Sequence, residues 1–109
     1  MANIYKNAKV DLTNNSETAV LTVPSDSRAV IKSIVVSEDS GNADSITLTI
    51  TDASSNVFSL FKTKAVSANA TVELLSQPLV LQESEILKAT AATANRLHII
   101  VSVLEINRS

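Results

Sequence analysis

Apolar residues that recur at every second position are the strongest constraint on how this chain folds. The segment SITLTIT, residues 45–51, places Ile46, Leu48 and Ile50 on one face of an extended strand and three threonines on the other. The segment TAVLTV, residues 18–23, alternates in a similar way. No stretch of three helical turns combines apolar residues at helical spacing with capping residues at its ends. The sequence therefore predicts an all-β protein.

Short polar segments separate the predicted strands. The other predicted strands are residues 4–12, 28–38, 57–66, 70–75, 78–81, 85–91 and 96–106. The segments between them are rich in Asn, Asp and Ser, which bond to their own backbone and favour turns. Roughly eight short strands predict one domain over residues 1–109, an antiparallel β-sandwich of the jelly-roll or immunoglobulin-like type. Because Gly41 is the one glycine, we expect positive φ angles at four asparagines, Asn42, Asn56, Asn69 and Asn95.

Composition excludes several classes of function. The nine Lys and Arg residues are dispersed over a chain of net charge −2, and the aromatic residues are Tyr5, Phe58 and Phe61 alone. Nucleic-acid binding by stacking and a carbohydrate-binding platform are therefore not expected. The first residues do not form a secretory signal, and no apolar run approaches the roughly 18 residues of a membrane span. Because the chain has no cysteine, it contains neither a disulfide framework nor a thiolate metal site.

The lone histidine, His98, is the first candidate for catalysis. It has no Gly-x-Ser-x-Gly motif or glycine-rich oxyanion loop to work with, and it lies within the apolar segment RLHIIVSVLEI. In an extended strand, His98 shares a face with Ile100 and Ser102, opposite the face that starts with Leu97. We interpret it as a structural histidine and expect no catalytic residue.

Two acidic groups are the candidates for a cation site. Glu83 and Glu85 are two residues apart and project the same way from an extended segment, but they lie in a turn where acidic residues usually face water. Glu38, Asp39 and Asp44 surround Gly41 without the spacing of a calcium-binding loop. We therefore expect no metal, no cofactor and no enzymatic activity.

Two long strands are apolar on both faces, and such strands need cover on both sides. In residues 96–106, Leu97, Ile99, Val101 and Val103 are expected to face the core. In residues 28–38 either face could be the outward one. One face carries Val30, Ile34 and Val36, and the other carries Ile31 and Val35. Phe58 is expected in the core with Leu60, and Phe61 at an interface. We predict contact with another subunit through six residues, Val30, Ile34, Val36, Ile100, Leu104 and Ile106.

The order of several segments resembles a known class of protein. These segments are YKNAKVDLT, TVP, RAVIKSIVVS, SITLTITDASSN and the stretch from VELLSQPLVL to RLHIIVSVLEI. Together they resemble small β-sandwich structural proteins of tailed bacteriophage virions, notably those of marine phages. The resemblance covers nearly the whole chain, but it consists of apolar and turn residues. Many relatives are expected to have a Gly-Asp turn where this chain has Ser84-Glu85, so the resemblance does not predict that turn type.

The resemblance implies a non-enzymatic virion structural protein. The first expectation is a capsid decoration or cement protein that binds the head lattice as a homo-oligomer. The alternatives are a neck or tail ring, a fibre-attachment component, and a host- or glycan-binding module on the virion surface, against which the lack of Trp counts. The implied partners are other copies of the chain and the major capsid protein, with no nucleic acid and no membrane. The implied location is the virion, assembled in the host cytoplasm.

Overall fold

The computed structural model describes residues 2–107, so Met1 and residues 108–109 of the predicted domain lie outside the described part. Within it the chain forms β-strands and no helix, and hence no helix that could cross a membrane. The predicted all-β antiparallel class is confirmed. The strands are β1 (Ala2–Leu12), β2 (Thr18–Thr22), β3 (Ser27–Glu38), β4 (Asp44–Thr51), β5 (Val57–Val66), β6 (Thr71–Glu73), β7 (Leu79–Leu81), β8 (Ile86–Ala91) and β9 (Leu97–Asn107).

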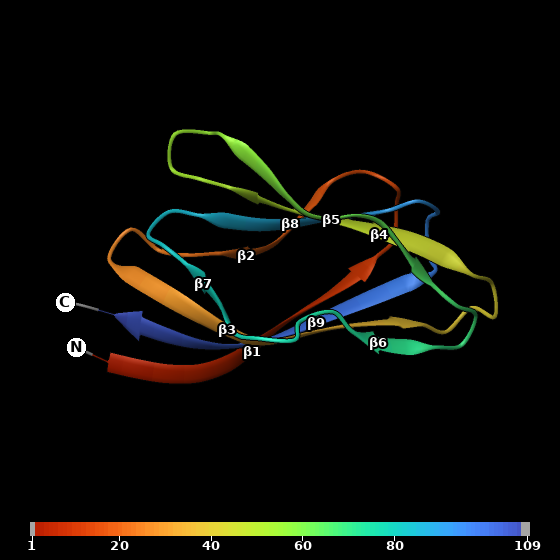
Figure 1. Ribbon diagram of the computed structural model, residues 1–109, viewed down its shortest axis with the longest axis horizontal. Coiled ribbons are helices and arrows are strands. Elements are labelled where there is room, and N and C mark those ends of the chain that lie inside the picture. Colours follow the sequence, from red (N-terminus) through yellow and green to blue (C-terminus); the bar gives the residue numbers. More distant parts are fainter. Residues whose placement is uncertain (1, 108–109) are drawn as a thin grey trace.

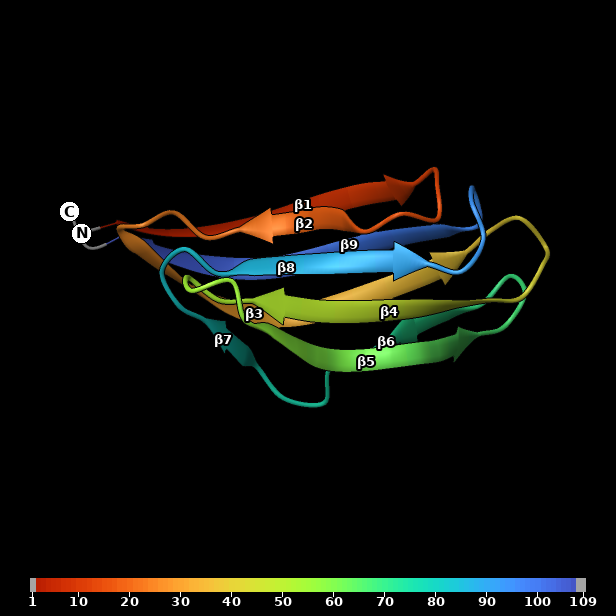
Figure 2. The same ribbon diagram turned by 90° about the horizontal axis from the view of Figure 1, so that it is seen from above.

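The strands form two antiparallel sheets that pack face to face (Figure 1). The five-stranded sheet has the order β1-β9-β3-β6, and β7 pairs with β3 beyond the end of β6. The four-stranded sheet has the order β2-β8-β4-β5 and covers the first sheet when the molecule is seen from above (Figure 2). The first and last strands pair along their whole length, from Ala2 opposite Asn107 to Leu12 opposite Leu97.

The connections identify the sandwich as a jelly roll. The chain crosses from one sheet to the other after β1, β2, β3, β5, β7 and β8, whereas only β4 to β5 and β6 to β7 stay within a sheet. Frequent crossing between two four-membered sheets is the double Greek-key arrangement of jelly rolls, in which β6 and β7 together act as one interrupted strand. An immunoglobulin-like sandwich has different sheet memberships. Of the two predicted sandwich types, the jelly roll is therefore the one observed.

Aliphatic side chains fill the space between the sheets. The predicted inner faces are confirmed for β4, where Ile46 and Leu48 are fully buried, and for β9. Among the described residues, twenty apolar side chains form one continuous core. Branched side chains suit this position because they pack well on a pleated surface. The large fully buried apolar residues are Leu12, Val23, Ile31, Ile34, Val36, Ile46, Leu48, Leu81, Leu87, Leu97 and Ile99.

The turns agree only in part with the expectation for asparagine. Asn69 and Asn95 adopt positive φ angles of 57° and 63°, as does Gly41. The expectation is wrong for Asn42 and Asn56. In the turn before β5, Ser55 takes the positive φ and the Asn56 amides bond to Asp52 instead. Outside the predicted positions, Thr63 and Ser84 also have positive φ, and Ser84 lies inside the turn from Gln82 to Glu85, whose type the resemblance did not predict.

Strand β5 departs from simple alternation, and the two predictions for its aromatic residues are wrong. Its pairing with β4 shifts register on both sides of Phe61, where Leu48 faces Phe61 but Thr49 faces Ser59. As a result, Phe61 packs against the core together with Leu60. Phe58 is 58% exposed, because the β4–β5 hairpin rises away from the other sheet at this end (Figure 1).

Candidate functional site

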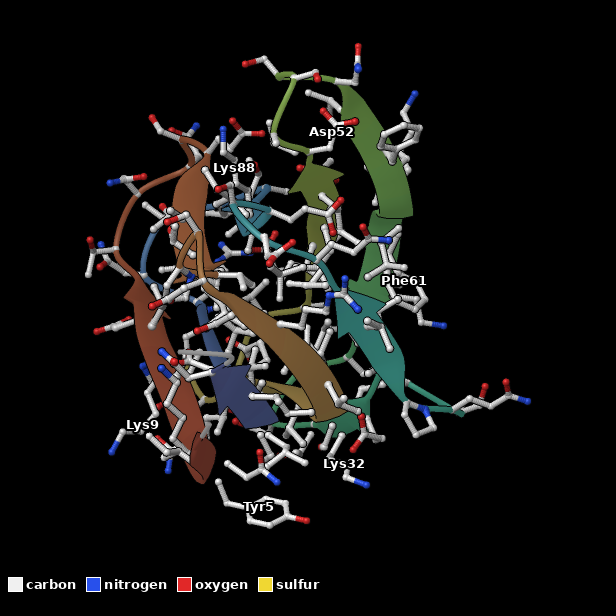
Figure 3. The ribbon with its side chains drawn as sticks, turned by 90° about the vertical axis from the view of Figure 1, so that its left-hand side faces the viewer. Tyr5, Lys9, Lys32, Asp52, Phe61 and Lys88 are labelled. Atoms are coloured by element: carbon white, nitrogen blue, oxygen red, sulfur yellow. The ribbon has the colours of Figure 1, made fainter. Side chains whose placement is uncertain are left out.

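The outer face of the five-stranded sheet carries most of the predicted interface. A row of apolar side chains crosses four strands, because Tyr5 pairs with Leu104, Leu104 with Val30, and Val30 with Val80. We call this set the apolar row. Its two ends are the most exposed, with Tyr5 at 74% and Val80 at 56%. Figure 3 shows Tyr5 projecting away from the four-stranded sheet. A sheet face open to water is normally polar, so this row distinguishes the outer face.

A second row lies four residues along β9 from the first. Here Lys9 pairs with Ile100, Ile100 with Val35, and Val35 with Glu73. Ile100 is 39% exposed and Val35 is half-buried. Ile106, beyond the apolar row, is also half-buried on the same face. Four of the six predicted interface residues, Val30, Ile100, Leu104 and Ile106, therefore lie on the outer face, where their role in contacts stays a prediction.

The placement of the other two predicted interface residues is wrong. Ile34 and Val36 have no exposed surface and belong to the core between the sheets. The reason is a β-bulge in β3, where Ile31 faces Val103 but Ser33 faces Ser102, which leaves Lys32 as an extra residue. One extra residue reverses which side chains face inward, so Ile31 and Ile34 both point into the core. Beyond the bulge, Val35 is the outward apolar residue.

Glu73 binds the backbone at this bulge. Its carboxylate accepts hydrogen bonds from the Ser33 hydroxyl, from the Ile34 amide at 2.9 Å and from the Leu75 amide at 3.1 Å. Partial burial acts to raise the pKa of Glu73, but these donors outweigh it, and the pKa is lowered from its ordinary value. Glu73 thus joins β3 to the end of β6 and stays ionised at neutral pH.

His98 lies at one end of the outer face between two carboxylates. Its Nε2 is 3.2 Å from Asp11 Oδ1 on β1, and its Nδ1 is 3.6 Å from Asp39 Oδ2 after β3. The three side chains are 39%, 61% and 66% exposed, respectively. This arrangement links the ends of three neighbouring strands through solvent-exposed groups, which usually contribute little to stability. Each ring nitrogen of His98 therefore faces a carboxylate.

Glu38 is a buried carboxylate that sequence reasoning missed. It is 2% exposed and accepts hydrogen bonds from the Ser40 hydroxyl and from three amides, those of Ser40 at 2.8 Å, Gly41 at 3.1 Å and Asn69 at 3.0 Å. Burial acts to raise the pKa of Glu38, but the donors prevail and lower it from 4.5 to about 2. The carboxylate therefore holds the β3–β4 turn against the β5–β6 turn. The sequence signal, a Glu followed by Ser-Gly two residues later, is too common to identify this role.

The acidic residues considered as cation ligands serve separate turns. Asp44 accepts a hydrogen bond from the Thr93 amide at 3.1 Å, whereas Asp39 faces His98. Glu85 accepts from the Gln82 amide at 2.7 Å and thereby closes its own turn. Within residues 2–107, no three His, Cys, Asp or Glu side chains are grouped so that they could hold a metal ion. The two candidate acidic groups therefore do not come together as a cation site within the described residues.

Comparison with known proteins gives matches in structure but none in sequence. No family model and no curated protein matches the chain. A chain from the structure of Bacillus endospore appendages, described as disulfide-linked pili, is similar over 98% of this chain and 89% of its own, with 10% identity and a TM-score of 0.59. A chain from the acidic stable capsid of a Helicobacter pylori bacteriophage is similar over 97% and 89%, with 10% identity and a TM-score of 0.58.

A third similar structure comes from a larger protein. A chain of infectious bursal disease virus is matched over 94% of this chain but 32% of its own length, with 7% identity and a TM-score of 0.58. Identities this low establish likeness of fold and nothing finer. The chain therefore shares its fold with a chain from a bacterial pilus, a chain from a phage capsid and part of a chain from another virus.

Proposed function

We propose that the chain is a non-enzymatic structural protein of a bacteriophage virion. Within the virion, we assign it to the capsid surface as a decoration or cement protein that binds the head lattice as a homo-oligomer. Its partners are further copies of itself and the major capsid protein, and its location is the virion assembled in the host cytoplasm. A neck or tail ring and a fibre-attachment component are the alternatives within the same class.

The observation that carries this proposal is the likeness to a chain of a phage capsid over nearly the full length of both. The resemblance of the segment order to tailed-phage structural proteins points the same way and is independent of the fold comparison. The apolar outer face adds a physical reason, because Tyr5 and Val80 are left open to water unless another molecule covers them. Lattice proteins present such faces because their working state is an assembly.

A subunit of a bacterial surface fibre is the second candidate. It is favoured by the likeness to the endospore appendage chain, which is as extensive as the likeness to the phage capsid. Those appendages are described as disulfide-linked, whereas this sequence contains no cysteine. A fibre built from this chain would therefore need a different link between subunits.

Copy number in purified particles tests the proposal. Quantitative mass spectrometry of virions from the phage that encodes the chain would compare it with the major capsid protein. For a decoration protein we expect on the order of hundreds of copies per particle. For a neck or tail component we expect only the number of copies that forms one symmetric ring. Purified protein added to particles that lack it should also rebind and raise their thermal stability. A chain absent from particles and found in surface fibres would contradict the proposal.

A further inference from the structure

We infer that a second copy of this chain covers the outer face of the five-stranded sheet. The apolar row of one copy packs against the apolar row of the other about a two-fold axis. The axis runs parallel to the strands and passes between β9 and β3. This dimer specifies one contact of the homo-oligomer in the proposed function and rests on it in that respect. It is tested on the isolated protein, so its failure would leave the virion role itself untouched.

The order of the strands makes the apolar row complementary to itself. A two-fold axis between β9 and β3 places β9 over β3 of the second copy, and β1 over its β7. Leu104 then lies over Val30 of the second copy, and Tyr5 lies over its Val80. Each contact occurs twice, as an isologous interface requires. The two most exposed members of the row therefore cover each other.

The second row matches in the same geometry. Ile100 lies over Val35 of the second copy, and Lys9 lies over its Glu73. The Lys9 side chain forms no ion pair with another residue in the range 2–107, and Figure 3 shows it pointing outward. Glu73 is ionised, because its hydrogen bonds favour the carboxylate. Opposite charges thus meet next to apolar contacts, which favours this register over a random one.

The face is large enough for a stable interface. The molecule measures 45 × 26 × 23 Å, and Figure 1 looks along the shortest of these directions at the two sheets stacked one above the other. The outer face is therefore outlined by the 45 and 23 Å dimensions. Such an outline accommodates the roughly 800 Å² that each partner contributes to a standard interface.

Pairing through the β1 edge of the five-stranded sheet is a competing mode of assembly, and the structure disfavours it. One edge of the five-stranded sheet is β1, whose Lys6 points inward and pairs with Glu105 at 2.7 Å, and the other edge consists of the short strands β6 and β7. Inward-pointing charges on an edge strand are a device that opposes pairing with another sheet. The outer face has no comparable charge within its apolar row. Within the five-stranded sheet, the outer face is therefore favoured over the β1 edge for self-association.

Cross-linking of single-cysteine variants tests the register. The natural sequence has no cysteine, so a short bismaleimide reacts only with thiols that are introduced. Tyr5→Cys and Val80→Cys should each give little covalent dimer alone, because their copies lie at opposite edges of the interface. A mixture of the two variants, after subunit exchange, should give covalent dimer. Efficient cross-linking of Tyr5→Cys with Lys9→Cys instead would show that one sheet is turned end to end relative to the other. That result would overturn the register.

Sedimentation of charge variants tests the surface itself. The wild-type protein should sediment as a dimer at micromolar concentration, and Leu104→Asp should be a monomer with an unchanged far-UV spectrum. The matched control is Thr22→Asp, which is exposed on the other sheet and should stay dimeric. Lys9→Glu, which alters only an exposed side chain, should lower the affinity of the dimer on the order of tenfold. This variant tests the surface even if Leu104→Asp fails to fold. A monomeric wild-type protein at high concentration, or unchanged association in Lys9→Glu, would refute the inference.

Discussion

At the scale of single residues, the most informative side chain is Glu38. A carboxylate buried at the end of a core strand would ordinarily oppose folding, yet this one accepts four hydrogen bonds from two turns. Two of the donating amides belong to Gly41 and Asn69, and both residues have positive φ. The carboxylate therefore stabilises a backbone arrangement that neither turn would hold as firmly by itself.

Glu38 should make the stability of the protein depend on acid. Its pKa is about 2 in the folded protein and 4.5 ordinarily, so its contribution is fully present above pH 4.5 and is lost as the pH falls towards 2. Urea unfolding across this pH window should show a shallower decline for Glu38→Gln than for the wild type, with a residual slope from Glu73 and Asp52, whose pKa values are also lowered. Glu17→Gln, an exposed control, should keep the wild-type slope. An equally steep decline in Glu38→Gln would contradict this assignment.

His98 should be dispensable for folding and assembly. Its partners Asp11 and Asp39 are mostly exposed, and ion pairs of this kind contribute roughly 0–1 kcal/mol. His98→Gln is expected to change the free energy of unfolding by less than about 1 kcal/mol and to leave oligomer mass and particle binding unchanged. Denaturant unfolding together with sedimentation would check both. A folded variant that no longer assembles would give His98 a functional role.

At the scale of elements, the bulge in β3 decides which face of the longest strand is buried. Before it, Ala29 and Ile31 face inward, and after it Ile34 and Val36 do. Removing the extra residue should therefore be far more harmful than changing it. Deletion of Lys32 would turn Ile34 and Val36 outward, and each would lose about 1.5–3 kcal/mol of burial free energy. Lys32→Ala, in contrast, alters only an exposed side chain. Thermal unfolding should show a near-native Lys32→Ala and a largely unfolded deletion variant; a stable deletion variant would contradict the assigned bulge.

These elements also show how far sequence reasoning reached. The alternation in residues 45–51 and 96–106 is unbroken, so the inner faces of β4 and β9 were predictable. One extra residue in β3 and two register shifts in β5 interrupt the alternation, and the pattern of apolar residues carries no mark of where these irregularities lie. Glu38 and Glu73 were not predictable because their donors, Asn69 and Ile34, lie about thirty or forty residues away. The outer apolar face was found from β9, whose alternation is regular.

At the scale of the whole molecule, the jelly roll joins segments that are distant in the chain. The two terminal strands pair over their entire length, and β3 pairs with β9. Folds dominated by such contacts fold slowly, since long loops must close before any pairing is rewarded. We expect refolding in the millisecond-to-second range. Stopped-flow circular dichroism would measure it, because the chain has no Trp to serve as a fluorescence probe. A complete refolding phase in microseconds would be inconsistent with this topology.

The interruption between β6 and β7 bears on how such a protein could diversify. Each of these short strands pairs with β3 on its own side of the bulge, and Ser76, Gln77 and Pro78 between them are exposed. The fold therefore already tolerates a break in this strand, and added residues would leave every existing pairing in place. A lineage could lengthen this segment, or an engineer could display a peptide there, without altering the core. The edge of the five-stranded sheet is in this sense a ready point for insertion.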